Sequence, residues 1–184
     1  MSKPQEDLTK ISKFLSFVLR HKPETINLTL DDQGWASVAD LIEKAKSQIT
    51  LTPELIRQVV IDNDKKRFSL SDDKHYIRAN QGHSVKVDLK LAPKKPPAVL
   101  YHGTATRFLN SIKQEGLKPG QRHHIHLSSD IETATAVGKR YGKPAILEVA
   151  AGAMHQQGFN FFLSENNVWL TEHVTPKFLS VISN

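Results

Sequence analysis

A short basic segment rich in proline divides this chain into two parts with different hydrophobic patterns. It reads Pro93-Lys94-Lys95-Pro96-Pro97. Because proline fixes φ and donates no backbone hydrogen bond, such a segment forms a stiff connection rather than a helix or a central strand. Apolar residues recur mainly at helical spacing before it and in short runs typical of strands after it. We therefore predict two domains, over 1–84 and 98–184, joined by a basic linker over 85–97.

The first domain is predicted to contain three helices followed by a β-hairpin. The expected elements are helices over 6–20, 38–47 and 53–63 and strands over 67–70 and 75–78. Ser37 and Thr52 stand where N-caps of the second and third helices belong, and Pro53 suits a first helical position. Three helices followed by a hairpin is the element order of a winged helix, which binds nucleic acid in many proteins and only protein in others.

The second domain is predicted to be rich in strands, which makes the fold class α+β. Strands are expected over 99–102, 125–128, 145–149, 159–163, 168–174 and 178–182, with helices over 105–115 and from 131 onward. Gly103 and Thr104 are expected to end the first of these strands, and Asp130 to cap the second helix.

Composition limits the class of protein. Hydrophobic residues make up 39% and charged residues 24% of the 184 residues, enough for packed cores. No apolar run reaches the length of a membrane span, and the first ten residues are polar, so we expect a cytoplasmic protein that is not membrane-bound. The absence of cysteine excludes disulfides and thiol catalysis. The net charge of +6 suits a polyanionic partner such as RNA. We expect a monomer.

Four basic or polar groups are candidates for binding an anion. They are Arg20-His21 at the end of the first helix, Lys65-Lys66-Arg67 before the hairpin, Arg78 with the following segment 81–84, and Lys139-Arg140 at the end of a later helix. Each has an ordinary explanation when taken alone, because cations are favourable at helix C-termini and charge runs are usually solvated turns. Arginine and histidine recurring at such positions nevertheless favour an anionic ligand.

Two histidines on predicted strands are candidates for a second site. His102 precedes Gly103-Thr104 and His126 lies two residues before Ser128, so each has a small hydroxyl residue nearby. A glycine on a strand allows a ligand to approach the backbone closely. The spacing of His123, His124 and His126 does not suit a metal, since alternation along a strand separates neighbours. No Rossmann fingerprint, Walker loop or nucleophile elbow is present.

Taken together, seven segments in order resemble the RNA 2′-phosphotransferase family, NAD-dependent enzymes also called tRNA 2′-phosphotransferases. The segments are Leu-Ser-Phe-Val-Leu-Arg-His-Lys-Pro at 15–23, Gly-Trp at 34–35, Lys-Arg-Phe at 66–68, Arg-Ala-Asn-Gln-Gly-His-Ser at 78–84, Leu-Tyr-His-Gly-Thr at 100–104, His-Ile-His-Leu-Ser at 124–128 and Val-Gly-Lys-Arg-Tyr-Gly-Lys-Pro at 137–144. The resemblance implies an N-terminal winged-helix domain and a C-terminal ADP-ribosyltransferase-like domain that binds NAD, with the active site in the cleft between the two domains, where ligand sites often lie.

The resemblance also implies a reaction and roles for residues. An internal RNA 2′-phosphate is transferred to NAD, which is consumed as a co-substrate, and no metal takes part. The catalytic residues implied are Arg20, His21, Arg67 and Arg140. Those implied to bind NAD are Tyr101, His102, Gly103, Thr104, His126 and Ser128. Those implied to bind the phosphate and RNA are Arg78, Gln81, His83 and Ser84.

The chain departs from the family pattern at one position. The family often has Arg-His-Gly where this chain has Arg140-Tyr141-Gly142, so the role of Tyr141 is open. Val168 stands where many ADP-ribosyltransferases have glutamate, and a phosphate nucleophile needs no strong general base. Two alternatives remain open. One is an ADP-ribosyltransferase acting on nucleic-acid ends or on protein, and the other is a non-enzymatic winged-helix binder of nucleic acid.

Overall fold

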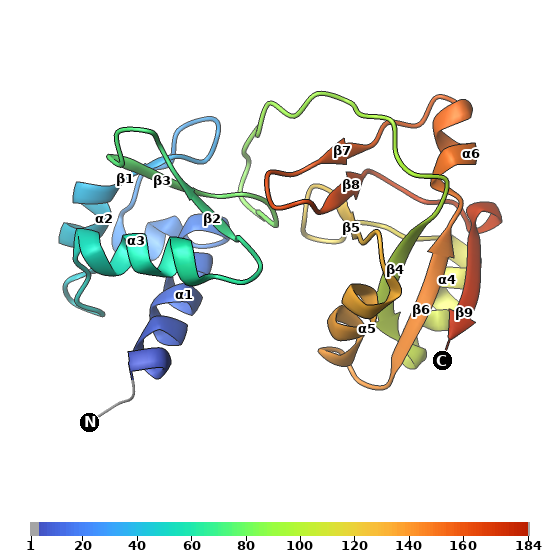
Figure 1. Cartoon of the computed structure of the whole chain (residues 1–184), viewed down its shortest axis with the longest axis horizontal. Helices are drawn as coiled ribbons and strands as arrows, with labels where there is room; N and C mark the ends of the chain where they lie inside the picture. Colours follow the sequence, from blue (N-terminus) through green and yellow to red (C-terminus); the bar gives the residue numbers. More distant parts are fainter. Residues whose placement is uncertain (1–3, 184) are drawn as a thin grey trace. The chain divides into compact units, whose positions relative to one another are not determined.

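A computed structural model describes residues 4–183, which form two compact units (Figure 1). Unit 1 extends to Lys90 and unit 2 begins at Leu91. This division lies inside the segment 85–97 that the prolines and the change of hydrophobic pattern single out. No helix among residues 4–183 is both long enough and apolar enough to cross a membrane.

Unit 1 contains three α-helices and one small sheet. The helices are α1 (Pro4–Arg20), α2 (Val38–Ala45) and α3 (Pro53–Asp62), with a 3-10 turn η1 (Pro23–Ile26) after α1. The strands are β1 (Ala36–Ser37), β2 (Phe68–Leu70) and β3 (Tyr76–Ala79), in the antiparallel order β1-β3-β2. The three predicted helices and the hairpin are confirmed to within a few residues. Neither η1 nor the two-residue strand β1 was predicted, and β1 is too short to show alternation.

The elements of unit 1 form where local chemistry favours them. The hydroxyl of Ser37 accepts a hydrogen bond from the Asp40 N–H at 3.2 Å, and that of Thr52 accepts one from the Leu55 N–H at 3.1 Å. These are the N-caps predicted for α2 and α3. Along α1, Leu15, Val18 and Leu19 are fully buried, while the C-terminal residues of the helix carry the candidate site.

Unit 2 contains two antiparallel three-stranded sheets. The first has the order β4-β6-β9, built from β4 (Leu100–Ala105), β6 (Pro144–Val149) and β9 (Leu179–Ser183). The second has the order β5-β8-β7, built from β5 (Ile125–Leu127), β8 (Trp169–Thr171) and β7 (Phe162–Leu163). Tyr101 and Ser128 exchange two backbone hydrogen bonds of 2.8 Å, which join β4 to the end of β5.

The helices of unit 2 differ in number from the prediction. They are α4 (Leu109–Glu115), α5 (Ile131–Lys139) and α6 (Ala151–Gln156), with 3-10 turns η2 (Thr106–Phe108) and η3 (Pro176–Phe178). Two helices were expected, and α6 is the additional one. Its six residues are too few for a helical period to stand out. Asp130 caps α5 as predicted, accepting a hydrogen bond from the Thr133 N–H at 2.7 Å. Strands β7 and β8 are shorter than predicted.

The expected end of the first strand of unit 2 is wrong. Strand β4 continues through Gly103 and Thr104 to Ala105, and Gly103 is paired with Ile146 of β6. A Cβ atom at position 103 would stand 1.7 Å from the carbonyl oxygen of Ala134. The glycine is therefore required because α5 packs directly on the backbone of β4, and the space in which a ligand was expected to approach this residue is filled by that helix.

Candidate functional site

The C-terminus of α1 is joined to the segment that follows β3. Arg20 is the last residue of α1 and is only 8% exposed. Its carbonyl oxygen accepts hydrogen bonds from the N–H groups of Ser84 at 2.9 Å and Val85 at 3.2 Å. These donors satisfy a carbonyl that a helix end would leave without an intrahelical partner. They also reduce the partial negative charge of the helix end, which would otherwise oppose an anion beside Arg20.

The side chain of Arg20 lies against Gly82. This glycine has φ +88°, and a Cβ atom there would stand 3.4 Å from both the Nε and the guanidinium carbon of Arg20. Any other residue would be strained in this left-handed conformation, and its Cβ would touch the guanidinium. The bare glycine backbone thus lets the guanidinium pack closely on the segment 81–84.

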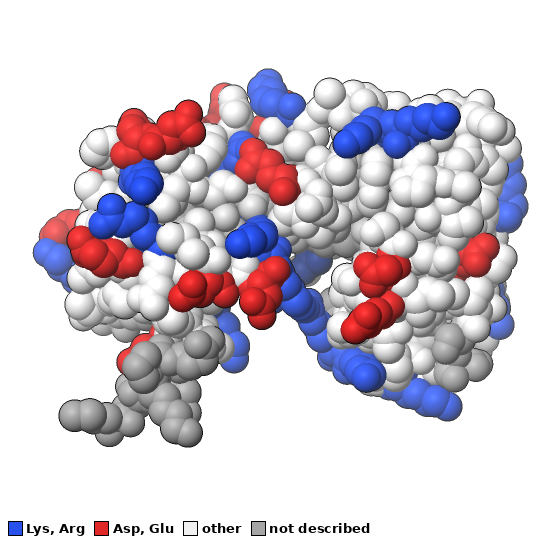
Figure 2. Space-filling view, viewed as in Figure 1, with Lys and Arg blue, Asp and Glu red and all other residues white. Residues whose placement is uncertain are grey.

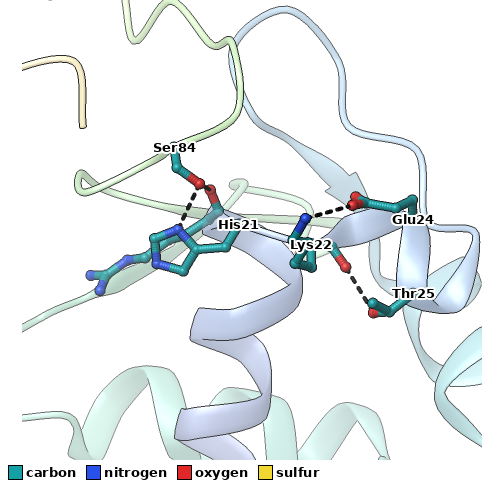
Figure 3. Close-up of polar contacts among 6 residues, drawn as sticks. His21, Lys22, Glu24, Thr25 and Ser84 are labelled. Carbon is teal, nitrogen blue, oxygen red and sulfur yellow. Dashed lines mark hydrogen bonds and ion pairs between the residues drawn. The ribbon is translucent and has the colours of Figure 1, made fainter. Parts of the chain in front are cut away.

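His21 follows directly and is bound by the same segment. Its Nδ1 lies 2.8 Å from the hydroxyl oxygen of Ser84 (Figure 3). Lys22 points elsewhere: its ammonium forms an exposed ion pair of 3.6 Å with Glu24, and its carbonyl oxygen accepts a hydrogen bond from the Thr25 hydroxyl. The segment after β3 therefore holds both Arg20 and His21, and Lys22 belongs to the surface of η1.

Arg67 lies at the start of the hairpin, next to the same segment. Its backbone N–H donates to Oδ1 of Asn63 at 3.2 Å, and its carbonyl oxygen accepts from the N–H of Asn80 at 2.8 Å. The side chain is half-buried, and its guanidinium makes no hydrogen bond or ion pair with any residue that the structure describes. The backbone is thus held on both sides while the charged group is available to a ligand.

The other predicted phosphate-binding residues are buried in unit 1. The guanidinium of Arg78 lies 4.6 Å from the centre of the Trp35 ring, a cation–π contact. His83 is 2% exposed, and its Nε2 is 3.3 Å from the position that a Cβ of Gly34 would occupy. Gln81 is also buried, and its side-chain oxygen has no hydrogen-bond partner among the described residues. Nε of Arg78 and Nε2 of His83 are likewise buried atoms with no hydrogen bond among the described residues, so all three side chains keep a polar atom that packing alone does not satisfy.

In unit 2, the predicted NAD-binding residues lie on β4 and β5, except Ser128, which directly follows β5. Nδ1 of His102 is 3.1 Å from the carbonyl oxygen of His126, and because a carbonyl only accepts, Nδ1 carries the proton. Burial lowers the pKa of His102, which outweighs the opposite effect of this hydrogen bond. The ring is therefore neutral, with a lone pair on Nε2, which makes no hydrogen bond among the described residues.

His126 is itself oriented by a residue that the sequence did not single out. A guanidinium nitrogen of Arg122 lies 3.1 Å from Nδ1 of His126, so this nitrogen is the acceptor. Arg122 lies in the loop before β5, where no pattern marks it. Tyr101 and Ser128 are joined by their backbones, as described above, and Thr104 is buried on β4. Five of the six residues predicted to bind NAD thus have side chains that lie along β4 and β5 or directly after β5. The sixth, Gly103, is covered by α5.

Arg140 and Val168 complete the set of predicted positions. Arg140 is exposed at the C-cap of α5, and its N–H donates to the Val137 carbonyl at 3.2 Å. Val168 stands in the turn between β7 and β8, where its N–H donates to the hydroxyl of Ser164 at 3.0 Å. Tyr141 is 45% exposed. Among residues 4–183, no three or more acidic or histidine side chains are grouped as a metal ion would require.

Comparison with known proteins decides the family. The model described as "RNA 2'-phosphotransferase, Tpt1 / KptA family" matches residues 6–173. The chain belongs to the RNA 2′-phosphotransferase family. A probable RNA 2′-phosphotransferase of Acaryochloris marina is 55% identical over 174 residues, covering 94% of this chain and 96% of that protein. One from Agrobacterium fabrum is 57% identical, covering 94% of each chain, and one from Rhodopirellula baltica is 54% identical, covering 97% and 98%.

Charge on this family member is distributed rather than concentrated. On the face shown in Figure 2, blue and red side chains lie side by side over unit 1, and most of unit 2 is white, with blue at its margins and a few red side chains on its face. A continuous basic surface for nucleic acid is therefore not seen on this face. The candidates for recognising an anion are thus single arginines of the candidate site, such as Arg20 and Arg67.

Proposed function

We propose that this protein removes an internal 2′-phosphate from RNA by transferring it to NAD. Membership of the RNA 2′-phosphotransferase family supports the RNA substrate and the group transferred. The observation that carries the proposal for this chain is the arrangement of Arg20 and His21, both held by the segment 81–84 at the end of α1. The resemblance noted in the sequence supplies NAD as the acceptor.

The first step needs a nucleophile, which the substrate brings. A phosphate monoester carries about −1.5 to −2 charge near neutral pH, so one of its oxygens can attack C1″ of the nicotinamide ribose. The C1″–N bond breaks and its electron pair goes to the nicotinamide, which leaves neutral. The RNA 2′-phosphate is then joined to ADP-ribose. No strong general base is required, which agrees with Val168 standing where a glutamate is common in ADP-ribosyltransferases.

The second step exchanges one phosphate ester for another. The ribose 2″-hydroxyl oxygen forms a bond to phosphorus, and the RNA 2′-oxygen leaves and takes up the proton that the 2″-hydroxyl gives up. The products are RNA with a 2′-hydroxyl and ADP-ribose 1″,2″-cyclic phosphate. Negative charge accumulates on the phosphoryl oxygens, and planar guanidinium groups bind such oxygens in pairs. We assign this stabilisation to Arg20, Arg67 and Arg140.

His21 is proposed as the acid–base residue. An imidazole can both take and give a proton near neutral pH, which suits it to this role. The Ser84 hydroxyl at 2.8 Å from Nδ1 holds the ring in one orientation. In this position the ring can either take the proton of the 2″-hydroxyl as that oxygen attacks phosphorus, or give a proton to the departing RNA 2′-oxygen. The binding of phosphate and RNA is assigned to the segment around β3 and after it. Its residues are Arg78, Gln81 with its buried acceptor, His83 and Ser84.

The residues of unit 2 fit a nucleotide co-substrate. The neutral ring of His102 offers the Nε2 lone pair as a fixed acceptor, which suits a ribose hydroxyl or an amide N–H. Tyr101, Thr104 and Ser128 add hydroxyl groups along the same two strands, and Arg122 keeps His126 in place. We propose that these side chains bind NAD and that Gly103 contributes through packing alone.

The two units also fit the fold classes that the resemblance implies. Unit 1 has three helices followed by the hairpin β2–β3, in the order of a winged helix. Unit 2 has two antiparallel sheets with short helices, as an α+β domain of the ADP-ribosyltransferase type would. We propose these two assignments, a monomeric protein, and the cytoplasm as its location.

The test uses a short RNA with one internal 2′-phosphate, incubated with the pure protein with and without NAD. We expect loss of the phosphate only with NAD, together with release of nicotinamide and ADP-ribose 1″,2″-cyclic phosphate. Nicotinamide release with the 2′-phosphate unchanged would instead indicate an ADP-ribosyltransferase acting on another acceptor. Binding of RNA without nicotinamide release would indicate a binding protein that is not an enzyme.

A further inference from the structure

Asn80 is a buried polar residue with no role in the site described so far. It follows β3 directly and is 4% exposed. Among the described residues it makes three hydrogen bonds, all within unit 1. Its Nδ2 donates to the Lys66 carbonyl at 2.6 Å, its Oδ1 accepts from the Ser69 hydroxyl at 2.7 Å, and its backbone N–H donates to the Arg67 carbonyl at 2.8 Å.

The peptide group between Lys66 and Arg67 is held from both sides. Its carbonyl oxygen accepts from Nδ2 of Asn80, and its N–H donates to Oδ1 of Asn63 at 3.2 Å. Lys66 has φ +48°, a left-handed conformation that is costly for a residue other than glycine. Two asparagine side chains on one peptide group offset that cost and fix the plane from which the Arg67 side chain extends.

We propose that Asn80 is the positioning residue of Arg67. The inference rests on the proposed function, in which Arg67 stabilises charge on the transferred phosphate. Because the Arg67 guanidinium has no partner among the described residues, its location depends on the backbone that carries it. Asn80 controls that backbone through both the Lys66 and the Arg67 carbonyl groups. A misplacement of a charged group by about 1 Å can cost on the order of 100-fold in rate.

The same segment positions the other two groups of unit 1. Gly82 lies against the Arg20 guanidinium and Ser84 binds the His21 ring. Residues 80, 82 and 84 thus each serve one member of the predicted catalytic set, in the order Arg67, Arg20 and His21. Asn80 sets the register of this segment against the hairpin, since its backbone continues the pairing of β2 with β3.

The experiment measures phosphate transfer from the 2′-phosphorylated RNA in single-turnover reactions. Asn80→Ala removes both side-chain hydrogen bonds. Asn80→Asp keeps the shape and an acceptor for Ser69 but puts a carboxylate oxygen against the Lys66 carbonyl. We expect both variants to lose about 100-fold in transfer rate while the KM for NAD stays at the wild-type value. Thr52→Ala is the control, because it removes a helix cap of unit 1 that touches neither Lys66 nor Arg67.

Coupling to Arg67 separates positioning from a general loss of structure. In an Arg67→Ala background, Asn80→Ala should lower the remaining rate less than threefold, because the group it positions is already missing. An equal loss in both backgrounds, or rates of the Asn80 variants within threefold of Thr52→Ala, would overturn the inference. If the Asn80 variants do not fold, Asn63→Ala tests the other side of the same peptide and should show the same coupling. A wild-type protein that leaves the phosphate on the RNA overturns the proposed function itself, and the inference with it.

Discussion

Ser84 Oγ lies 2.8 Å from Nδ1 of His21, a hydrogen bond between residues 63 positions apart in the chain (Figure 3). The Ser84 N–H also donates to the carbonyl oxygen of Arg20, so one residue binds two consecutive members of the candidate site. Because a hydroxyl can donate or accept, Ser84 accommodates either tautomer of the ring while fixing its orientation.

Ser84→Ala tests whether this orientation matters. Removing one hydrogen bond of ordinary strength costs about 1 kcal/mol, so we expect the rate of phosphate transfer to fall roughly three- to tenfold. Ser84→Thr keeps the hydroxyl and should retain most of the rate. The measurement is a pH–rate profile of all three proteins, since a change in how His21 is held also moves the pH dependence. Equal profiles for Ser84→Ala and the wild type would contradict the assignment.

Gly82→Ala should disturb Arg20 specifically. A Cβ there would be in ordinary contact with the guanidinium carbon of Arg20, at 3.4 Å. Because the backbone has φ +88°, relief of its strain would shift the segment on which the guanidinium packs. Gly158→Ala is a matched control, because Gly158 has φ +95° and nothing within 4 Å of a new Cβ. Both variants should lose about 1–2 kcal/mol of stability from the left-handed backbone. Only Gly82→Ala should also lower the transfer rate, by roughly tenfold or more. A similar rate in the two variants would show that Arg20 tolerates the extra methyl group.

Local features of this fold could be predicted from the sequence, because their causes are local. Ser37, Thr52 and Asp130 each accept the hydrogen bond expected of an N-cap, and the hairpin β2–β3 lies where the two strands were predicted. Arg20 and His21 could be marked as candidates since a helix end is also a local pattern. Their roles came from the resemblance to a family and not from spacing.

Contacts between distant residues could not be predicted in the same way. Gly103 gave an ambiguous signal, since a glycine on a strand fits a strand end, a ligand or a packed helix. The helix that decides between these explanations begins at Ile131, well beyond any local window. Asn80 lies within the segment 78–84, but its role could not be predicted, because its partners Lys66, Arg67 and Ser69 lie on the other side of the hairpin. Arg122 is only four residues from His126, but it lies in a loop, where no helical or strand spacing marks the pair.

Gly103→Ala should destabilise unit 2 severely. The new Cβ would stand 1.7 Å from the Ala134 carbonyl oxygen, which belongs to backbone and cannot rotate away. Separating α5 from β4 by enough to relieve this overlap would open the packing between them, so we expect a loss of about 3 kcal/mol or more. Urea denaturation of the variant is the measurement. Gly120→Ala is the control, because a Cβ there meets nothing within 4 Å and only the left-handed backbone, with φ +63°, opposes it, at a cost of about 1–2 kcal/mol. A loss no larger than in the control would show that α5 can shift freely.

The stability of unit 2 should fall as the solution becomes acidic, partly through His102. Burial lowers the pKa of His102 below the ordinary value of 6.5, so the unfolded chain takes up the proton first as the pH falls. The stabilising contribution is complete above pH 6.5 and is lost progressively as the pH falls from there toward the lower pKa of the folded state. His102→Asn, which keeps a side-chain N–H, should reduce this loss. The measurement is the urea midpoint at pH 7.5 and pH 5.

His124 provides the comparison for that experiment. Burial also lowers its pKa, against a smaller opposite effect of Glu172. His124→Asn should therefore remove a separate share of the acid sensitivity, and the double variant should lose both shares. If His102→Asn left the difference between the two midpoints unchanged, folding would not lower the pKa of His102. The neutral ring, with its lone pair on Nε2, would then not be a feature that the fold enforces.

Arg20→Lys is the most direct test of the chemistry assigned to unit 1. Lysine keeps the positive charge but replaces a planar fork by a single ammonium, which cannot bind two phosphoryl oxygens side by side. Removing one donor that stabilises developing charge typically costs about 100- to 1,000-fold in rate, and we expect Arg20→Lys to approach the loss in Arg20→Ala. Arg57→Lys is the control, since Arg57 forms only a surface ion pair of 3.4 Å with Glu54. If Arg20→Lys transferred phosphate at nearly the wild-type rate, charge alone would be sufficient and the bidentate role of Arg20 would be wrong.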